Sequence, residues 1–173
     1  MSIAHPIVRP SQMRHPLVCQ HISDEVKAKI KASWYNENPK TEKEKAEMTG
    51  LLALHDKLLS FGGEEVLMPS IEEDLEAILE RGQFFHGDHV HMMPGEPSQC
   101  HSNSARMWDA NRGRCWIATG YALSEDGLWR QHSWVVQPLT LSWRVWETTK
   151  KRIAYFGVVF NDDECEEFLF NNM

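Results

Sequence analysis

The sequence predicts an α+β protein in which helices occupy the first half of the chain and strands the second. Up to residue 82, apolar residues recur at helical spacing, and the segments end at glycines such as Gly62-Gly63 and Gly82. Beyond residue 112, four segments rich in β-branched and aromatic residues follow one another across short polar turns. We therefore expect helices packed on an antiparallel sheet of about four strands.

Capping signals and glycine stops mark where each helix begins and ends. Thr41 with Glu44, and Ser70 with Glu73, each form a capping-box signature, and Ser23 is a further N-cap candidate. A stiff turn that contains Pro94, Gly95 and Pro97 precedes one more helical segment, 99–111. The expected helices cover 23–34, 41 to the Gly62-Gly63 pair, 70–82, 99–111 and 161–170. The expected strands cover 114–123, 128–136, 142–149 and 153–160.

Size and composition favour one domain with a genuine core. The chain has 173 residues, of which 42% are hydrophobic, and it contains seven Trp and seven Phe. Residues 1–22 contain three prolines and little periodicity, so we expect an irregular N-terminal arm there. Residues 23–173 are expected to form a single α+β domain, with a helical part over 23–82 and a helix-plus-sheet part over 83–173.

Charge and cysteine usage exclude several classes of protein. A formal net charge of -7 argues against nucleic-acid binding, which needs a basic face. The sequence has no run of 18 apolar residues and no apolar segment of signal-peptide type at its start, so we expect neither a membrane span nor secretion. Four scattered cysteines without a C-x-x-C pair fit neither a disulfide framework nor a zinc knuckle, which favours a reducing cytoplasm.

Three residues have the chemistry of a nucleophilic cysteine enzyme. Cys100 lies at the start of an expected helix, where free amide groups and the helix dipole lower the pKa of a thiol. His132 lies on an expected strand and Glu147 on the next one. A carboxylate that accepts from one imidazole nitrogen leaves the other nitrogen to face the thiol. We expect these three side chains to form a catalytic triad.

The surroundings of Cys100 supply candidates for holding a substrate. Backbone N–H groups of the helix start, and the side-chain amides of Gln99 and Asn103, are candidate donors to an oxyanion. Trp134 alternates with His132 along the strand, so both project from one face while Ser133 projects from the other.

The motifs S-Q-C, T-G-Y-A-L, H-S-W-V-V and E-T-T, in this order, resemble those of the transglutaminase-like cysteine enzymes within the papain-like superfamily. The resemblance covers residues 98–160 and implies a papain-like core. It implies Cys100 as nucleophile, His132 as base and Glu147 as orienting acid, with Gly120-Tyr121 and Trp134 as the matching G-Y pair and aromatic. Glu147 replaces the usual Asp, T-T replaces a proline-containing sequence, and the interval of 32 residues from position 100 to position 132 is short for the group.

The function expected first is a cysteine-dependent hydrolase or acyl transferase, of the protease, amidase or deamidase type. It would act on an amide or ester bond of a protein, peptide or small molecule, through a thioester acyl-enzyme and without a cofactor. Tyr121 and Trp134 are expected to contact the substrate. The sequence does not define the oligomeric state.

Two alternatives come from other classes of protein. One is a non-catalytic protein-binding module, similar to a viral or bacterial inhibitor, whose acidic surface suits a basic partner. The other is a metal-binding protein that uses His86, His89 and His91 in F-F-H-G-D-H-V-H. The chain has no H-E-x-x-H motif, and we favour a loop beside the cleft for this segment.

Overall fold

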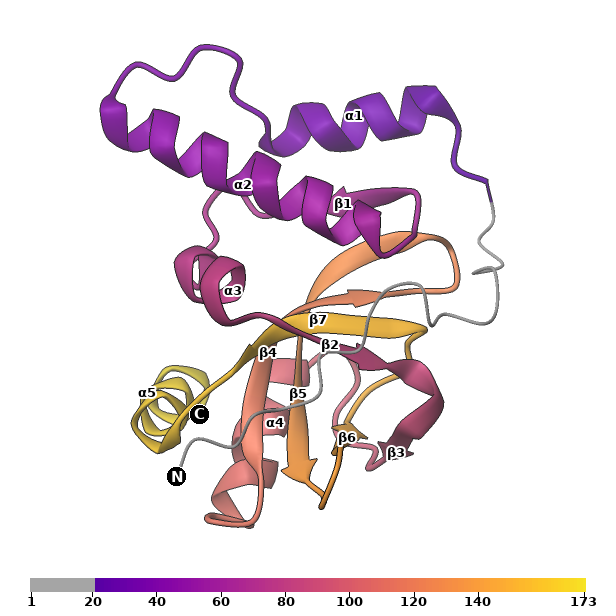
Figure 1. The fold of residues 1–173 in the computed structure, drawn as a ribbon, viewed down its shortest axis with the longest axis vertical. Coiled ribbons are helices and arrows are strands. Elements are labelled where there is room, and N and C mark those ends of the chain that lie inside the picture. The colour runs from indigo at the N-terminus through magenta and orange to yellow at the C-terminus, as the bar shows by residue number, and fades with distance from the viewer. Residues whose placement is uncertain (1–20) are drawn as a thin grey trace.

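A seven-stranded mixed sheet forms the centre of the computed structural model, which describes residues 21–173 (Figure 1). The strands are β1 (Glu65–Leu67), β2 (Gln83–His86), β3 (Val90–Met92), β4 (Trp116–Leu123), β5 (Leu128–Pro138), β6 (Trp143–Glu147) and β7 (Ala154–Val159). Their order across the sheet is β2-β7-β4-β5-β6-β3, and β1 pairs with β5. The helices are α1 (Asp24–Trp34), α2 (Glu42–Ser60), α3 (Leu75–Arg81), α4 (Cys100–Asp109) and α5 (Asp162–Asn172).

The α+β class and the four long strands are confirmed, but the expected sheet was too small. The structure adds three short strands, β1, β2 and β3, and two of them pair in parallel, β1 with β5 and β3 with β6. Strands of three or four residues are too short to show an alternating pattern. Parallel pairing joins segments far apart in the chain, so it has no local signature.

The capping signals were read correctly at two expected helices and wrongly at a third. Ser23 accepts from the first turn of α1, and Thr41 forms a reciprocal capping box with Glu44. The box expected at Ser70 is wrong, because α3 begins only at Leu75. Glu72, inside the expected first turn, is instead buried and accepts a hydrogen bond from a tyrosine on β4, which holds this segment out of the helix.

Two hydrophobic clusters pack on the two faces of the sheet. The first face carries Tyr121 of β4 and Phe156 of β7 and is covered by α2, α3 and α5. The second face carries Phe85 of β2, Trp134 of β5 and Tyr155 of β7, and the Trp134 ring packs against the other two. Since alternate residues of a strand point to opposite faces, neighbours on β5 belong to different environments.

Two glycines bring β4 and β7 together beside Trp134. Gly120 pairs with Gly157 and has a φ of +155°, a conformation that side chains rarely adopt. A Cβ atom on Gly157 would lie 2.1 Å from the carbonyl oxygen of Thr119 and 2.8 Å from the Trp134 ring. This part of the sheet therefore requires glycine, and its tight packing supports the strand that carries His132.

Of the expected N-terminal arm, residues 1–20 lie outside the described residues, as does Cys19. Among the helices that the structure describes, none combines the length and apolar character that crossing a bilayer requires.

Candidate active site

Cys100 is the first residue of α4, where the chain turns sharply into the helix. The preceding residues form an exposed turn that includes Ser98, with a φ of 60°. Gln99 occupies the N-cap and makes no side-chain capping bond to the described residues. The first N–H groups of α4 are therefore not covered by a cap, and the positive end of the helix dipole lies at the cysteine.

His132 and Glu147 form a buried pair on β5 and β6. The His132 Nε2 atom lies 2.8 Å from the Glu147 Oε2 atom, and the two residues are 3% and 0% exposed. Thr149 donates to Glu147 Oε1 from both its backbone N–H and its hydroxyl. The Tyr155 hydroxyl, 3.0 Å away, donates to Oε2. The carboxylate is thus fully supplied with donors, and the second imidazole nitrogen, Nδ1, is left for another partner.

The Cys100 thiol is that partner. Cys100 and His132 interact, since each shifts the pKa of the other through hydrogen bonding and charge, and the backbone of Ser133 also helps to lower the pKa of the thiol. We call Cys100, His132 and Glu147 the Cys-His-Glu trio. The structure brings together the three side chains that the sequence singled out.

The electrostatics of the trio favour a thiolate and an imidazolium. Burial of the Cys100 sulfur works against ionisation, but the hydrogen bond and positive charge of His132 outweigh it, so the thiol pKa is lowered. Burial also opposes the charged form of His132, yet Cys100 and Glu147 together raise its pKa to about 9. The pKa of Glu147 is lowered, because His132 and Thr149 outweigh the burial of the carboxylate. Opposite charges in contact thus stabilise each other inside the fold.

An interrupted edge of β5 makes room for the start of α4. On one side β5 pairs with β4 from Trp129 to Val136. On its other side, β1 pairs with residues 128–130 and β6 with residues 135–138. Within the described part of the chain, no strand pairs with residues 131–134 on that second edge. The N-terminal end of α4 packs there, which is why Cys100 reaches His132.

The other expected substrate-binding residues lie in four different places. Gln99 is exposed beside Cys100. The Asn103 amide is bonded on both its oxygen and its nitrogen to the backbone of Glu96, so it braces the turn before α4. Trp134 is fully buried, and its ring stacks on the His132 ring with 6.3 Å between the centroids, so it supports the imidazole. Tyr121 points to the opposite face of the sheet from His132.

The three histidines of the candidate metal site are spread over three elements. His86 ends β2, His89 ends the 3-10 turn Gly87–His89, and His91 lies on β3 with its ring against Trp146. Among residues 21–173 no group of three or more His, Cys, Asp or Glu side chains is arranged to hold a metal ion.

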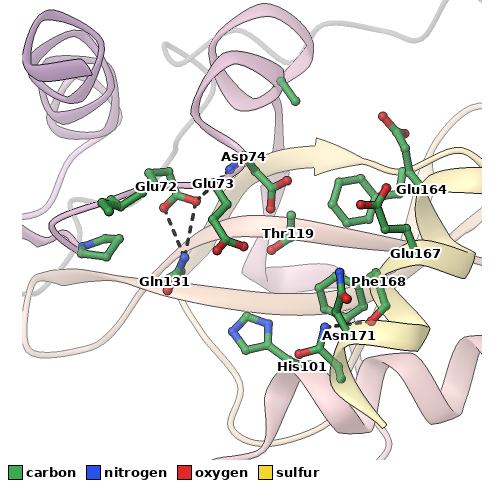
Figure 2. A pocket seen from close by; sticks show the side chains of 15 residues that line it. Glu72, Glu73, Asp74, His101, Thr119, Gln131, Glu164, Glu167, Phe168 and Asn171 are labelled. Atoms are coloured by element: carbon green, nitrogen blue, oxygen red, sulfur yellow. Dashed lines mark hydrogen bonds between the residues drawn. The ribbon is translucent and has the colours of Figure 1, made fainter. Parts of the chain in front are cut away.

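A pocket of about 560 Å³ lies on the other face of the sheet, and Cys100 does not line it. Figure 2 shows Glu72, Asp74 and Thr119 around this pocket, with Gln131 beside Glu72 and His101 at its lower edge. Five carboxylates line it, and its lining residues include no lysine or arginine. It is therefore an acidic hollow that belongs to the face opposite the trio.

Sequence reasoning missed four side chains next to the trio. Thr149 and Tyr155 support Glu147, while Ser133 and His101 contact each other at 2.6 Å beside the Cys100–His132 contact. Thr149 belongs to the E-T-T motif and could have been found there, since an Asx-type turn places such a donor two residues after a carboxylate. The other contacts join residues distant in the chain and leave no local signal.

Comparisons with protein-family models, with characterised proteins and with solved structures give no match for this chain.

Proposed function

We propose that this protein is a cysteine-dependent hydrolase or acyl transferase that acts on an amide or ester bond through a thioester acyl-enzyme. One observation carries the proposal: a partly exposed cysteine at a helix N-terminus contacts a histidine that a buried carboxylate holds in place. Nucleophile, base and orienting group within hydrogen-bond reach are the elements that this chemistry requires.

The first half of the reaction makes the thioester. The Cys100 thiolate attacks the carbonyl carbon, forming a C–S bond while the π electrons move onto the oxygen. Free N–H groups at the start of α4 supply donors near the developing oxyanion. When the C=O bond re-forms, the amine or alkoxide leaves and takes the proton from the His132 imidazolium.

The second half of the reaction releases the acyl group. Neutral His132 removes a proton from water, or from an amine acceptor, as that nucleophile attacks the thioester carbon. The tetrahedral intermediate then expels the Cys100 thiolate, and the imidazolium is restored. Glu147 keeps the ring oriented through Nε2 and stabilises its positive charge in both halves.

We also propose that the fold is a small transglutaminase-like variant of the papain-like architecture. The support is a cysteine that opens a helix packed on the sheet, and a histidine and an acid on adjacent strands. The mixed sheet with its short added strands fits a reduced form of such a core. The connections between β4, β5, β6 and β7 are each only a few residues long.

The proposal can be tested with an activated ester, because the natural substrate is not needed for acylation. We expect p-nitrophenyl acetate to acetylate Cys100, detected by mass spectrometry of the peptide that contains it. Cys100→Ala should abolish this product, and His132→Ala should slow its formation by about 10²–10⁴-fold. His86→Ala is the matched control, because His86 lies outside the trio, and it should react like the wild type.

The pH profile gives a second readout. Turnover of an amide, such as a p-nitroanilide, should decline as pH rises through about 9, the pKa of His132, because the imidazolium can then no longer protonate the leaving amine. The p-nitrophenyl ester should not show this decline, because p-nitrophenolate leaves without a proton. A Cys100→Ala protein that turns over the ester at the wild-type rate would overturn the proposal.

A further inference from the structure

Two consecutive residues of α4 interact with two consecutive residues of β5. Cys100 contacts His132, and the next residue, His101, places its Nδ1 atom 2.6 Å from the Oγ atom of Ser133. That hydroxyl lies 3.0 Å from the Oγ1 atom of Thr119 on β4. A second row of hydrogen bonds, from His101 through Ser133 to Thr119, therefore runs beside the Cys-His-Glu trio.

The two rows lie on opposite faces of the sheet. Ser133 and Thr119 are directly paired across β5 and β4, and both are buried on the face of the acidic pocket. His132 points to the other face, toward Glu147. The start of α4 thus straddles the interrupted edge of β5, with one side chain fixed on each face.

The second row ties the first turn of α4 directly to the sheet. Gln99 makes no side-chain capping bond within residues 21–173, and the Asn103 amide is bonded to Glu96 in the preceding turn. By contrast, the His101 bond ends on a strand that is paired with β4 along the whole interval. This bond therefore links the first turn of α4 to the interrupted stretch of β5.

We propose that His101 is a positioning residue: through Ser133 it holds the start of α4 on β5 and so keeps the Cys100 sulfur in contact with the His132 imidazole. The inference rests on the proposed function, since it assigns a task to the support of that same site. His101 acts through Ser133 and does not itself touch the reacting atoms.

Ser133 links the two rows in a second way. Its backbone hydrogen-bonds to the Cys100 sulfur, while its side chain accepts or donates the His101 bond. A shift of α4 relative to Ser133 lengthens both contacts to the sulfur. Burial of the sulfur favours the neutral thiol, so ionisation depends on these contacts. Burial and the charge of His132 lower the pKa of His101, which favours its neutral form.

The test is the pH dependence of Cys100 alkylation by iodoacetamide, followed on the Cys100 peptide by mass spectrometry. Wild type should titrate below the value of about 8.5 for a free cysteine. His101→Ala should move the midpoint toward about 8.5 and slow alkylation at pH 7 by roughly tenfold. His101→Asn should recover most of that rate, since its amide nitrogen can reach Ser133. Arg106→Ala, at an exposed site on α4, should match the wild type.

A folded His101→Ala protein that keeps the wild-type midpoint would overturn the inference. If His101→Ala does not fold, Ser133→Ala decides, because it removes the side-chain link and keeps the backbone donor. An unchanged midpoint in folded Ser133→Ala would equally overturn it. His132→Ala separates the two proposals. If wild type and His132→Ala both titrate like a free thiol, the proposed function fails. If the wild-type midpoint is low, His132→Ala raises it, and the His101 and Ser133 variants leave it unchanged, then this inference fails and the proposed function stands.

Discussion

Glu147 and Glu72 are buried carboxylates on opposite faces of one sheet, and each accepts a hydrogen bond from a tyrosine, yet their pKa values move in opposite directions. Burial raises the pKa of Glu72, with the neighbouring Glu73 adding repulsion, and the bonds from Tyr121 and Gln131 do not offset it. Burial also opposes ionisation of Glu147, but the His132 imidazolium and Thr149 lower its pKa.

The difference lies in the cation. Both carboxylates have a tyrosine hydroxyl and further donors, but only Glu147 has a positively charged partner, at 2.8 Å. Neutral hydrogen bonds do not compensate a buried negative charge by themselves, whereas an ion pair with its remaining donors supplied does. On the face of the Cys-His-Glu trio, the buried carboxylate is stabilised in its charged form. On the face of the acidic pocket, neighbouring carboxylates repel one another.

The largest expected effect comes from neutralising Glu147. Glu147→Gln should lower the free energy of unfolding by about 3 kcal/mol, because it removes one partner of a buried ion pair. The pKa of His132 should fall from about 9, and Cys100 alkylation at pH 7 should slow. Urea unfolding and NMR titration of the imidazole measure these changes.

Glu72→Gln is the matched control for Glu147→Gln. It should leave Cys100 alkylation unchanged and shift the free energy of unfolding by no more than about 1 kcal/mol, toward higher stability at pH 7. If both variants lose the same stability, the cation does not distinguish the two faces.

The tyrosines sharpen the comparison at smaller cost. Tyr155→Phe should lower the free energy of unfolding by about 1 kcal/mol with little dependence on pH, since Glu147 keeps His132 and Thr149. Tyr121→Phe should cost about 1–2 kcal/mol and cost more at pH 8 than at pH 5, because it removes a donor that favours the ionised form of Glu72. Equal losses at both pH values for Tyr121→Phe would contradict this account.

An effect smaller than those of the Glu147 and Tyr121 variants is expected at Asp74, whose pKa is raised from 3.8 to about 6 by burial and by repulsion from Glu72 and other carboxylates. The sign follows from linkage: the folded state holds this proton more tightly, so stability is highest below about pH 4 and is lost as pH rises through about 6. Asp74→Asn should remove that loss. After allowance for solvent screening, it should gain about 1 kcal/mol at pH 7.

Denaturant unfolding of Asp74→Asn and wild type at pH 4 and pH 7 measures this difference. If the difference in unfolding free energy between Asp74→Asn and wild type is the same at pH 4 and pH 7, Asp74 titrates like an exposed carboxyl group.

The sequence predicted most of the trio's local setting. A proline-glycine turn and a helical pattern placed Cys100 at a helix start, and strand alternation placed His132 and Trp134 on one face. It did not predict β1, β2 or β3, because so few residues carry no readable period. The box expected at Ser70 failed because a tertiary contact of Glu72 overrides the local helix signal.

The sequence by itself determined which residues open helices, which lie on strands and which face of β5 each side chain takes, because backbone propensity and periodicity are local. Only the tertiary structure decided that the edge of β5 is interrupted at residues 131–134, so that α4 docks there and joins Cys100 to His132. It also decided that Glu147 meets a cation while Glu72 does not. Both outcomes depend on the approach of segments distant in the chain, and the charge and burial that fix their pKa values exist only once those segments have packed.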